Sequence, residues 1–505
     1  MSVENNKKIL SNTLFMYFRM FFSLFVSLYT SRVVLQELGV EDFGIYSVVG
    51  GVVAMFSFLN ASMGTATSRF FNFEIGQKGD IQTVFTSALI IHLLITVLVL
   101  LAGAGLGYSV VFEYLNIDAT RLEAAKWVYG LSLLTACMAV LQVPYSAMIV
   151  SYEHFKAFAY LDIVSVLLKL GIVYSLSILG GDRLITYATL VFVASCIIFI
   201  GNLCYVMNKF DVSHFNPTVN NNLVKRMLSF SGWDLYGNAS VLARTQGVNI
   251  LLNLFFGALL NAASGIAMQV QGAVMSFAAS ALAAVRPQIV KSYASGDYLR
   301  TSFLVLNTAK FTFFILLMIS LPLILEMDYV LSLWLGSVPD YAVLFCQYTL
   351  IFNFIANISS VIVSAIHATG HIKRPSLING SLYLLVVPIT YVAYFYDYPA
   401  QIAYQVNIAM VIIGMLSNAW TLNLLLPNFS FLSFINKVIL PCAGCTLLVV
   451  AVAWLCMQQF EPSFYRLCLV SLVSILTTII AVYYFAIDST QRKTINNFIL
   501  NKIKR

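Results

Sequence analysis

Residues 303–325 read FLVLNTAKFTFFILLMISLPLIL, an apolar run of helical length that contains one charged residue, Lys310. About 20 apolar residues are enough for a helix to cross the hydrocarbon core of a bilayer. A charge at that depth costs about 3 kcal/mol on insertion scales, so it is usually paired, placed in a wet cavity or functional. This stretch predicts a membrane-spanning helix in which Lys310 is paired, lies in a wet cavity or has a function.

Apolar runs of helical length recur along the rest of the chain. Its 505 residues are 60% hydrophobic and only 10% charged, with a mean hydropathy of +0.87. A soluble domain carries about 25% charged residues, so the composition predicts an all-α polytopic membrane protein. We expect fourteen transmembrane helices, with approximate cores at 11–31, 44–66, 84–107, 126–148, 158–180, 185–207, 228–256, 262–285, 303–325, 343–366, 377–396, 402–426, 434–456 and 465–486.

The distribution of basic residues predicts the topology. Of the 28 Lys and Arg residues, nineteen fall on the side of the predicted membrane that holds the N-terminus, five on the other side and four within spans. The positive-inside rule then places both termini in the cytoplasm. The net charge of +7 thus reflects topology, and we expect no nucleic-acid partner. Arg19 interrupts the first apolar run, which argues against a cleavable signal peptide.

The chain divides into two similar halves. Gly44-Ile45 recurs as Gly265-Ile266, and the helices that end in Arg69 and Arg286 are each followed by Gly-Asp. Chance similarity of Gly/Ala-rich helices is the alternative to duplication. Together with the predicted spans, this division gives five segments: an N-terminal six-helix segment 1–210, a cytoplasmic linker 211–225, a second six-helix segment 226–427, two further helices within 428–490 and a basic tail 491–505.

Six charges lie inside predicted spans, and four of them are basic. Arg244 and Lys310 are the strongest candidates for contacting a passenger, and Arg19 and Lys169 are further candidates for the cavity. Asp162 and Asp234 are candidates for counter-charges or for ion coupling. Asp162 and Lys169 are seven residues apart, so they share a helix face and also suit a structural ion pair. Arg69 and Arg286 lie at cytoplasmic helix ends, where they either snorkel or line a cytoplasmic mouth.

Several predicted spans carry one polar stripe. Asn353 and Asn357 belong to such a stripe in the tenth span, and Asp234 heads another in the seventh. Polar groups avoid hydrocarbon, so these stripes face either other helices or water. Hydrogen bonding between helices and the lining of a cavity both remain open for them, although stripes with Arg19 or Asp234 favour the cavity.

The sequence offers no signature of an enzyme or of an ATP-driven pump. The predicted loops are short, and no GxxxxGK[ST] motif occurs. Cys442 and Cys445 lie within a predicted helix without a second ligand pair, which favours helix packing over a metal site. We expect no catalytic residue, no metal and no cofactor, with coupling to a proton or sodium gradient as the open source of energy.

Three stretches resemble a known family: TLFMYFRMFFSLFVSLYTSRVVLQELGVEDFGIYSVV at 13–49, VPYSAMIVSYEHFKAFAYLDIVSVLLKLGIVY at 143–174 and SAIHATGHIKRPSLINGSLYLLVVPITY at 364–391. They are similar to the polysaccharide-transporter family of the multidrug/oligosaccharidyl-lipid/polysaccharide (MOP) exporter superfamily, which includes O-antigen and capsule flippases. The resemblance implies two pseudo-symmetric six-helix bundles around a central cavity, plus two C-terminal helices, in a bacterial inner membrane. It implies flipping of undecaprenyl-pyrophosphate-linked oligosaccharide from the cytoplasmic to the periplasmic leaflet by alternating access. It also implies lipid-linked oligosaccharide, membrane lipid and other polysaccharide-assembly proteins as partners.

Other functions remain open. A cation-coupled multidrug antiporter of the same superfamily needs an acidic interior, and here four basic residues face two acidic ones. A membrane polysaccharide polymerase or ligase needs larger external loops than this chain offers. A bare lipid scramblase fits the sequence as well. Identifying the molecule that the protein transports would distinguish these functions.

Overall fold

The computed structural model of the protein describes residues 14–23, 26, 30, 33–34, 37–38, 42, 45–46, 57–109, 120–176, 178–213, 220–256, 258–335, 338–487 and 492. These residues are helical apart from caps, turns and short connections, and they contain no strand. The predicted all-α architecture is confirmed.

Eleven described helices are long and apolar enough to cross a membrane. They match the third to sixth and the eighth to fourteenth predicted spans. About half of the first and of the second predicted span lies outside the described residues; within the first, Leu14–Ser23 forms a short apolar helix. The seventh corresponds to α7 (Asn221–Phe256), which is long enough to span but carries charges along its length. The protein is a multi-pass membrane protein.

The chain forms two compact units. Unit 1 comprises Met1–Asn238 with Tyr293–Ser295, and unit 2 comprises Ala239–Ser292 with Gly296–Arg505. The division falls inside α7. The described residues of the predicted linker at 211–225 include a 3-10 turn, Asp211–Ser213, and the first residues of α7.

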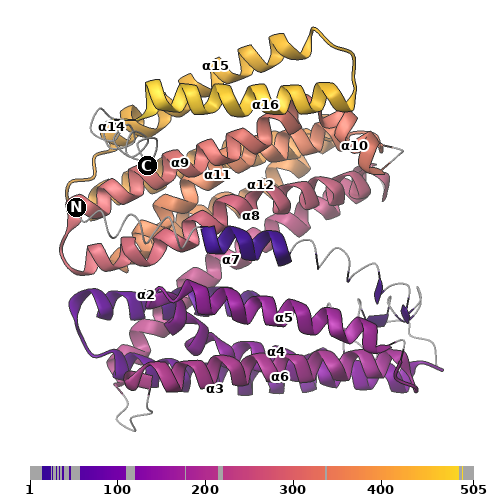
Figure 1. Ribbon diagram of the computed structural model, residues 1–505, viewed down its shortest axis with the longest axis vertical. Helices are drawn as coiled ribbons and strands as arrows, with labels where there is room; N and C mark the ends of the chain where they lie inside the picture. Colours follow the sequence, from indigo (N-terminus) through magenta and orange to yellow (C-terminus); the bar gives the residue numbers. More distant parts are fainter. Residues whose placement is uncertain are drawn as a thin grey trace, which may run out of the picture. The chain divides into compact units, whose positions relative to one another are not determined.

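Unit 1 is a helical bundle centred on α4 (Figure 1). Its helices are α2 (Ser57–Gln77), α3 (Ile81–Ala102), η1 (Gly103–Gly107), α4 (Leu122–Ser151), α5 (Phe155–Leu176), α6 (Arg183–Lys209) and the first half of α7. Helix α4 packs against α2, α3 and α6, and α5 packs against α6. Small residues at the centre, including Ala124, Ala125 and Ala188, allow the helices to approach closely.

An ion cluster joins the start of α4 to the start of α6. Arg121 donates from Nε to Oδ1 of Asp42 at 2.8 Å and from Nη1 to Oδ2 of Asp182 at 2.6 Å. Asp182 also caps α6, because Oδ1 accepts from the backbone N–H groups of Leu184 and Ile185. Partial burial raises the pKa of Asp182, but the hydrogen bonds from Arg121 and from these amides outweigh it, so the pKa lies below its ordinary value.

This cluster predicts a loss of stability in acid. A carboxylate whose folded pKa is depressed stabilises the fold above its unfolded pKa, about 3.9 for Asp, and stops doing so as the pH falls through the folded value. We expect the unfolding temperature to drop as the pH is lowered below about 4. The drop should be smaller in Asp182→Asn than in wild type or in Asp340→Asn, whose side chain is exposed. Equal acid sensitivity in all three proteins would show that the cluster does not control it.

Unit 2 contains the second half of α7 and the remaining helices: α8 (Ala258–Ala294), α9 (Tyr298–Leu325), α10 (Met327–Leu335), α11 (Ala342–Thr369), α12 (Lys373–Phe395), α13 (Ile402–Leu425), α14 (Phe431–Phe434), η4 (Ile435–Ile439), α15 (Leu440–Met457), α16 (Phe464–Ala481) and η5 (Val482–Ala486). Helix α11 packs against α9 and α13, and α13 packs against α12. Helices α15 and α16 lie against each other and against α9 (Figure 1).

A buried ion pair fixes one end of the C-terminal hairpin formed by α15 and α16. Arg466, at the start of α16, donates from Nη2 to Oε2 of Glu326 at 2.7 Å, and from Nη1 to the carbonyl of Phe460 at 3.0 Å. The Glu326 side chain is 0% exposed, so Arg466, and not water, offsets the cost of burying its carboxylate. A buried salt bridge therefore joins the start of α16 to the C-terminal end of α9.

Candidate functional site

Arg244 lies in the second half of α7 and packs against other helices of unit 2. Its guanidinium carbon is 5.1 Å from the ring centre of Phe352 on α11 and 4.7 Å from that of Tyr383 on α12. The side chain is half-buried, and its Nη1 is buried with no hydrogen-bond partner among the described residues. Stacking on two aromatic faces stabilises the cation without neutralising it, because the rings carry no net charge.

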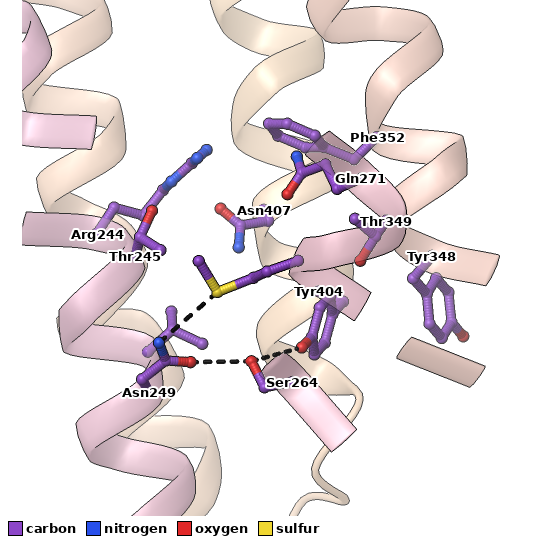
Figure 2. A pocket seen from close by; sticks show the side chains of 12 residues that line it. Arg244, Thr245, Asn249, Ser264, Gln271, Tyr348, Thr349, Phe352, Tyr404 and Asn407 are labelled. Atoms are coloured by element: carbon purple, nitrogen blue, oxygen red, sulfur yellow. Dashed lines mark hydrogen bonds between the residues drawn. The ribbon is translucent and has the colours of Figure 1, made fainter. Parts of the chain in front are cut away.

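A cavity of about 60 Å³ lies beside Arg244 (Figure 2). It is formed by α7, α8, α11 and α13, and its lining is Arg244, Thr245, Val248, Asn249, Ser264, Met268, Gln271, Tyr348, Thr349, Phe352, Tyr404 and Asn407. No Asp or Glu is among these residues. The cavity combines one cation with amides, hydroxyls and aromatic rings.

One wall of the Arg244 cavity is a hydrogen-bonded chain. Tyr404 donates to Ser264 Oγ at 3.1 Å, and Ser264 donates to Asn249 Oδ1 at 2.9 Å (Figure 2). Asn407 also lines the cavity (Figure 2), and its Oδ1 is buried without a partner among the described residues. A buried polar atom without a partner costs about 1–3 kcal/mol, so the cavity favours a ligand that offers hydrogen bonds.

The residue types in the cavity suit an anion or the hydroxyl groups of a sugar, and its volume of about 60 Å³ admits a group of phosphate size rather than a whole sugar. A guanidinium presents a planar set of N–H donors that matches phosphate and carboxylate oxygens. Amide and hydroxyl groups bind sugar hydroxyls, and aromatic rings stack against their apolar faces. A small cation would meet Arg244 and be repelled.

Lys310 lies in a different cavity from Arg244. It is on α9, is 5% exposed and donates to the backbone carbonyl of Ala486 at 2.5 Å. The cavity at Lys310 is bordered by the C-terminal hairpin, not by α7. The two strongest passenger candidates of the sequence are therefore not neighbours in one site.

Unit 1 holds a separate polar cavity of about 460 Å³ between α4, α5 and α6, and both Asp162 and Lys169 line it. Asp162 Oδ2 is 3.5 Å from Nη1 of Arg19 and accepts from Ser23 Oγ at 3.0 Å. Arg19 also lies over the ring of Phe158 at 5.2 Å. Asp162 therefore pairs with Arg19 on another helix and not with Lys169 on its own helix, the pair that the sequence spacing also suited.

Other predicted site residues contact neighbouring helices within their unit. Asn238 donates to both Asp234 (3.1 Å) and Ser62 on α2 (2.9 Å). The guanidinium carbon of Arg69 is 4.7 Å from the ring centre of Phe70, and it is also stacked on Phe73 and Phe230. Arg286 lies near the end of α8, next to Pro287. A role of Arg69 and Arg286 at a cytoplasmic mouth stays a prediction.

Asn353 and Asn357 are buried within unit 2. Asn353 donates to the carbonyl of Gln271 at 3.3 Å, and Asn357 donates to Thr312 Oγ1 at 2.9 Å. Neither lines the Arg244 cavity. These contacts correspond to the interhelical hydrogen bonding that the sequence left open for this stripe.

Sequence reasoning missed most of the Arg244 cavity. Asn249 belongs to the polar stripe of α7, but Ser264, Gln271, Tyr404 and Asn407 come from helices whose polar residues carry no distinctive spacing. Their selection depends on which faces of α8 and α13 pack toward α7, and a single sequence does not encode that in a local pattern.

No family model matches the sequence, and no curated protein matches it. Solved structures do match in fold. A MATE transporter in the bent conformation has a TM-score of 0.72 at 14% identity, covering 83% of this chain and 96% of that one. An outward-facing multidrug resistance MATE family transporter of the MOP superfamily has a TM-score of 0.68 at 15% identity, covering 82% and 93%.

A third match is a MOP superfamily transporter from Pyrococcus furiosus, described as having a binding pocket of reverse polarity that suggests a different function. Its TM-score is 0.67 at 14% identity, covering 82% of this chain and 96% of that one. At these identities the matches establish the fold. The chain has the fold of MATE transporters of the MOP superfamily.

Proposed function

We propose that this protein is a membrane exporter of the MOP superfamily whose cargo is an anionic amphiphile. The specific cargo we propose is undecaprenyl-pyrophosphate-linked oligosaccharide, moved from the cytoplasmic to the periplasmic leaflet of a bacterial inner membrane. The observation that carries this proposal is Arg244, a partly buried cation in a polar cavity whose lining has no carboxylate. The fold supports the coarser role of exporter.

Physical chemistry connects this cavity to a phosphate-bearing cargo. A pyrophosphate head group cannot enter hydrocarbon unaided, whereas its polyprenyl tail can stay in the bilayer. In a low-dielectric interior, a guanidinium attracts phosphate more strongly than it does in water. Asn249, Gln271 and Asn407 supply amides beside Arg244 that suit the hydroxyl groups of a sugar.

A cation-coupled multidrug antiporter is the second candidate. The solved neighbours are MATE transporters, one of them described as a multidrug resistance transporter, and these matches support this candidate better than the flippase. Asp162, in the polar cavity of unit 1, is the residue that suits ion coupling. Arg244 counts against a cationic drug in unit 2, and the reverse polarity described for the Pyrococcus protein offers a precedent for another cargo in this fold.

Depletion of the protein in its own bacterium distinguishes these functions. We would extract lipid-linked oligosaccharide and test whether a membrane-impermeant reagent added to the periplasm modifies it. The flippase function predicts accumulation of single repeat units that the reagent cannot reach. Normal export together with raised sensitivity to cationic dyes would identify the multidrug antiporter. Repeat units that reach the periplasm but stay unpolymerised or unligated would instead indicate an enzyme.

A further inference from the structure

Unit 2 contains a second cationic cavity, between α9 and the C-terminal hairpin. It has a volume of about 320 Å³, near the lower end of small-molecule sites, which span about 300–1,000 Å³. One face of α9 forms one wall, through Ser302, Asn307 and Lys310. The segment around η4 forms another, through Asn436 and Lys437, and the end of η5 closes the third side.

The charges of this cavity have one sign. Both charged lining residues that the structure describes are lysines, Lys310 and Lys437. Lys310 lies at the inner end and is 5% exposed, whereas Lys437 is exposed. Two ammonium groups surrounded by Asn and Ser side chains form a set of hydrogen-bond donors that suits phosphate oxygens.

Irregular backbone builds this site. Of the three π-helical segments in the described residues, two border the cavity: η4 carries Asn436 and Lys437, and η5 ends at Ala486. The carbonyl of Ala486 is the one that accepts from Lys310 Nζ. A π turn adds a residue and rotates the following side chains relative to a regular helix, and such turns occur frequently at functional sites. Their coincidence at one cavity points to a site shaped for a ligand.

The apolar side chains around the cavity favour the phosphate of a lipid over a free phosphate ion. Two large apolar side chains in the lining of the cavity are strongly exposed, Leu299 (71%) and Phe485 (67%). In a membrane protein such side chains face lipid tails, so a ligand at this site contacts acyl chains as well as the two lysines. A free phosphate ion would gain nothing from this apolar rim.

We propose that this cavity binds one anionic phospholipid, with its phosphate at Lys310 and Lys437 and its acyl chains along Leu299 and Phe485. The bound lipid holds the end of the C-terminal hairpin that lies away from the Arg466–Glu326 pair. This site is separate from the Arg244 cavity and does not depend on the cargo of the exporter.

Native mass spectrometry of the purified full-length protein tests the proposal. Phosphatidylglycerol and phosphatidylcholine are titrated against wild type, Lys437→Gln and the Lys310→Gln/Lys437→Gln double variant. Arg374→Gln is the matched control, because it removes an exposed cation of unit 2 outside the cavity. One lysine near a membrane surface contributes about fivefold to anionic-lipid affinity, so we expect that loss in Lys437→Gln, a larger loss in the double variant and none in the control.

The lipid proposal is overturned by any of three results. The first is equal phosphatidylglycerol affinity in wild type and the double variant. The second is equal affinity of wild type for phosphatidylglycerol and phosphatidylcholine, which would mean that the site does not distinguish lipids by the charge of the head group. The third is displacement of bound phosphatidylglycerol by millimolar inorganic phosphate, which would assign the site to the free ion. Unchanged unfolding temperatures of the variants confirm that each remains folded.

Discussion

Replacing Arg244 by Glu is expected to abolish export of the anionic cargo while leaving the protein inserted and folded. The substitution puts a carboxylate beside the rings of Phe352 and Tyr383, where a phosphate group would be repelled. Neutral Arg244→Gln removes the attraction without adding repulsion. A hydrogen bond to a charged group contributes about 1.5–3 kcal/mol, so we expect export to fall by about tenfold to a hundredfold in Arg244→Gln.

Arg226→Gln is the matched control for these variants. It lies on the same helix as Arg244, in the part that belongs to unit 1, and its side chain is exposed. Arg244→Lys keeps the charge but loses the planar group that stacks on two rings, so we expect partial activity. The readouts are surface polysaccharide and the amount of lipid-linked oligosaccharide that the periplasmic reagent modifies, with protein level measured in the same cells.

The same variants separate the two candidate functions. If the cargo is a drug cation, the negative charge introduced by Arg244→Glu should improve its export, and resistance to cationic dyes should rise in this variant. Full export of lipid-linked oligosaccharide by Arg244→Glu would refute the anionic-cargo proposal outright.

Arg466→Met is expected to destabilise the protein by about 3–5 kcal/mol, because it leaves the buried carboxylate of Glu326 without its cation. The side chain of Glu326 is 0% exposed and that of Arg466 is 14% exposed, so water cannot replace the lost partner. Denaturant unfolding in detergent measures the change. Methionine retains much of the apolar stem of arginine, so the effect reports the charge more than the packing.

Two further variants show whether burial is the cause. Combining Arg466→Met with Glu326→Gln removes both charges, and we expect it to be more stable than Arg466→Met alone. Arg183→Met breaks a pair with Glu37 in which the arginine side chain is 53% exposed, and a loss below about 1 kcal/mol is expected there. Similar losses in Arg466→Met and Arg183→Met would mean that the buried pair has no special role.

The sequence determined the class of fold. Hydropathy and length located eleven of the long apolar helices, because a helix in lipid satisfies its own backbone hydrogen bonds and needs an apolar surface whatever its neighbours are. The intramembrane charges were also visible in the sequence, since each interrupts an apolar run. Both signals are local, and neither requires knowledge of how the helices pack.

Only the tertiary structure decided what those charges contact. Arg19 pairs with Asp162, which lies on a helix far along the chain, and Lys310 bonds to the carbonyl of Ala486, 176 residues away. Arg244 and Lys310 each line a cavity without a carboxylate, but these are two separate cavities, whereas Lys169 shares its cavity with Asp162. Partner choice depends on which helix faces meet, and those faces are set by packing summed over whole bundles, which no local pattern records.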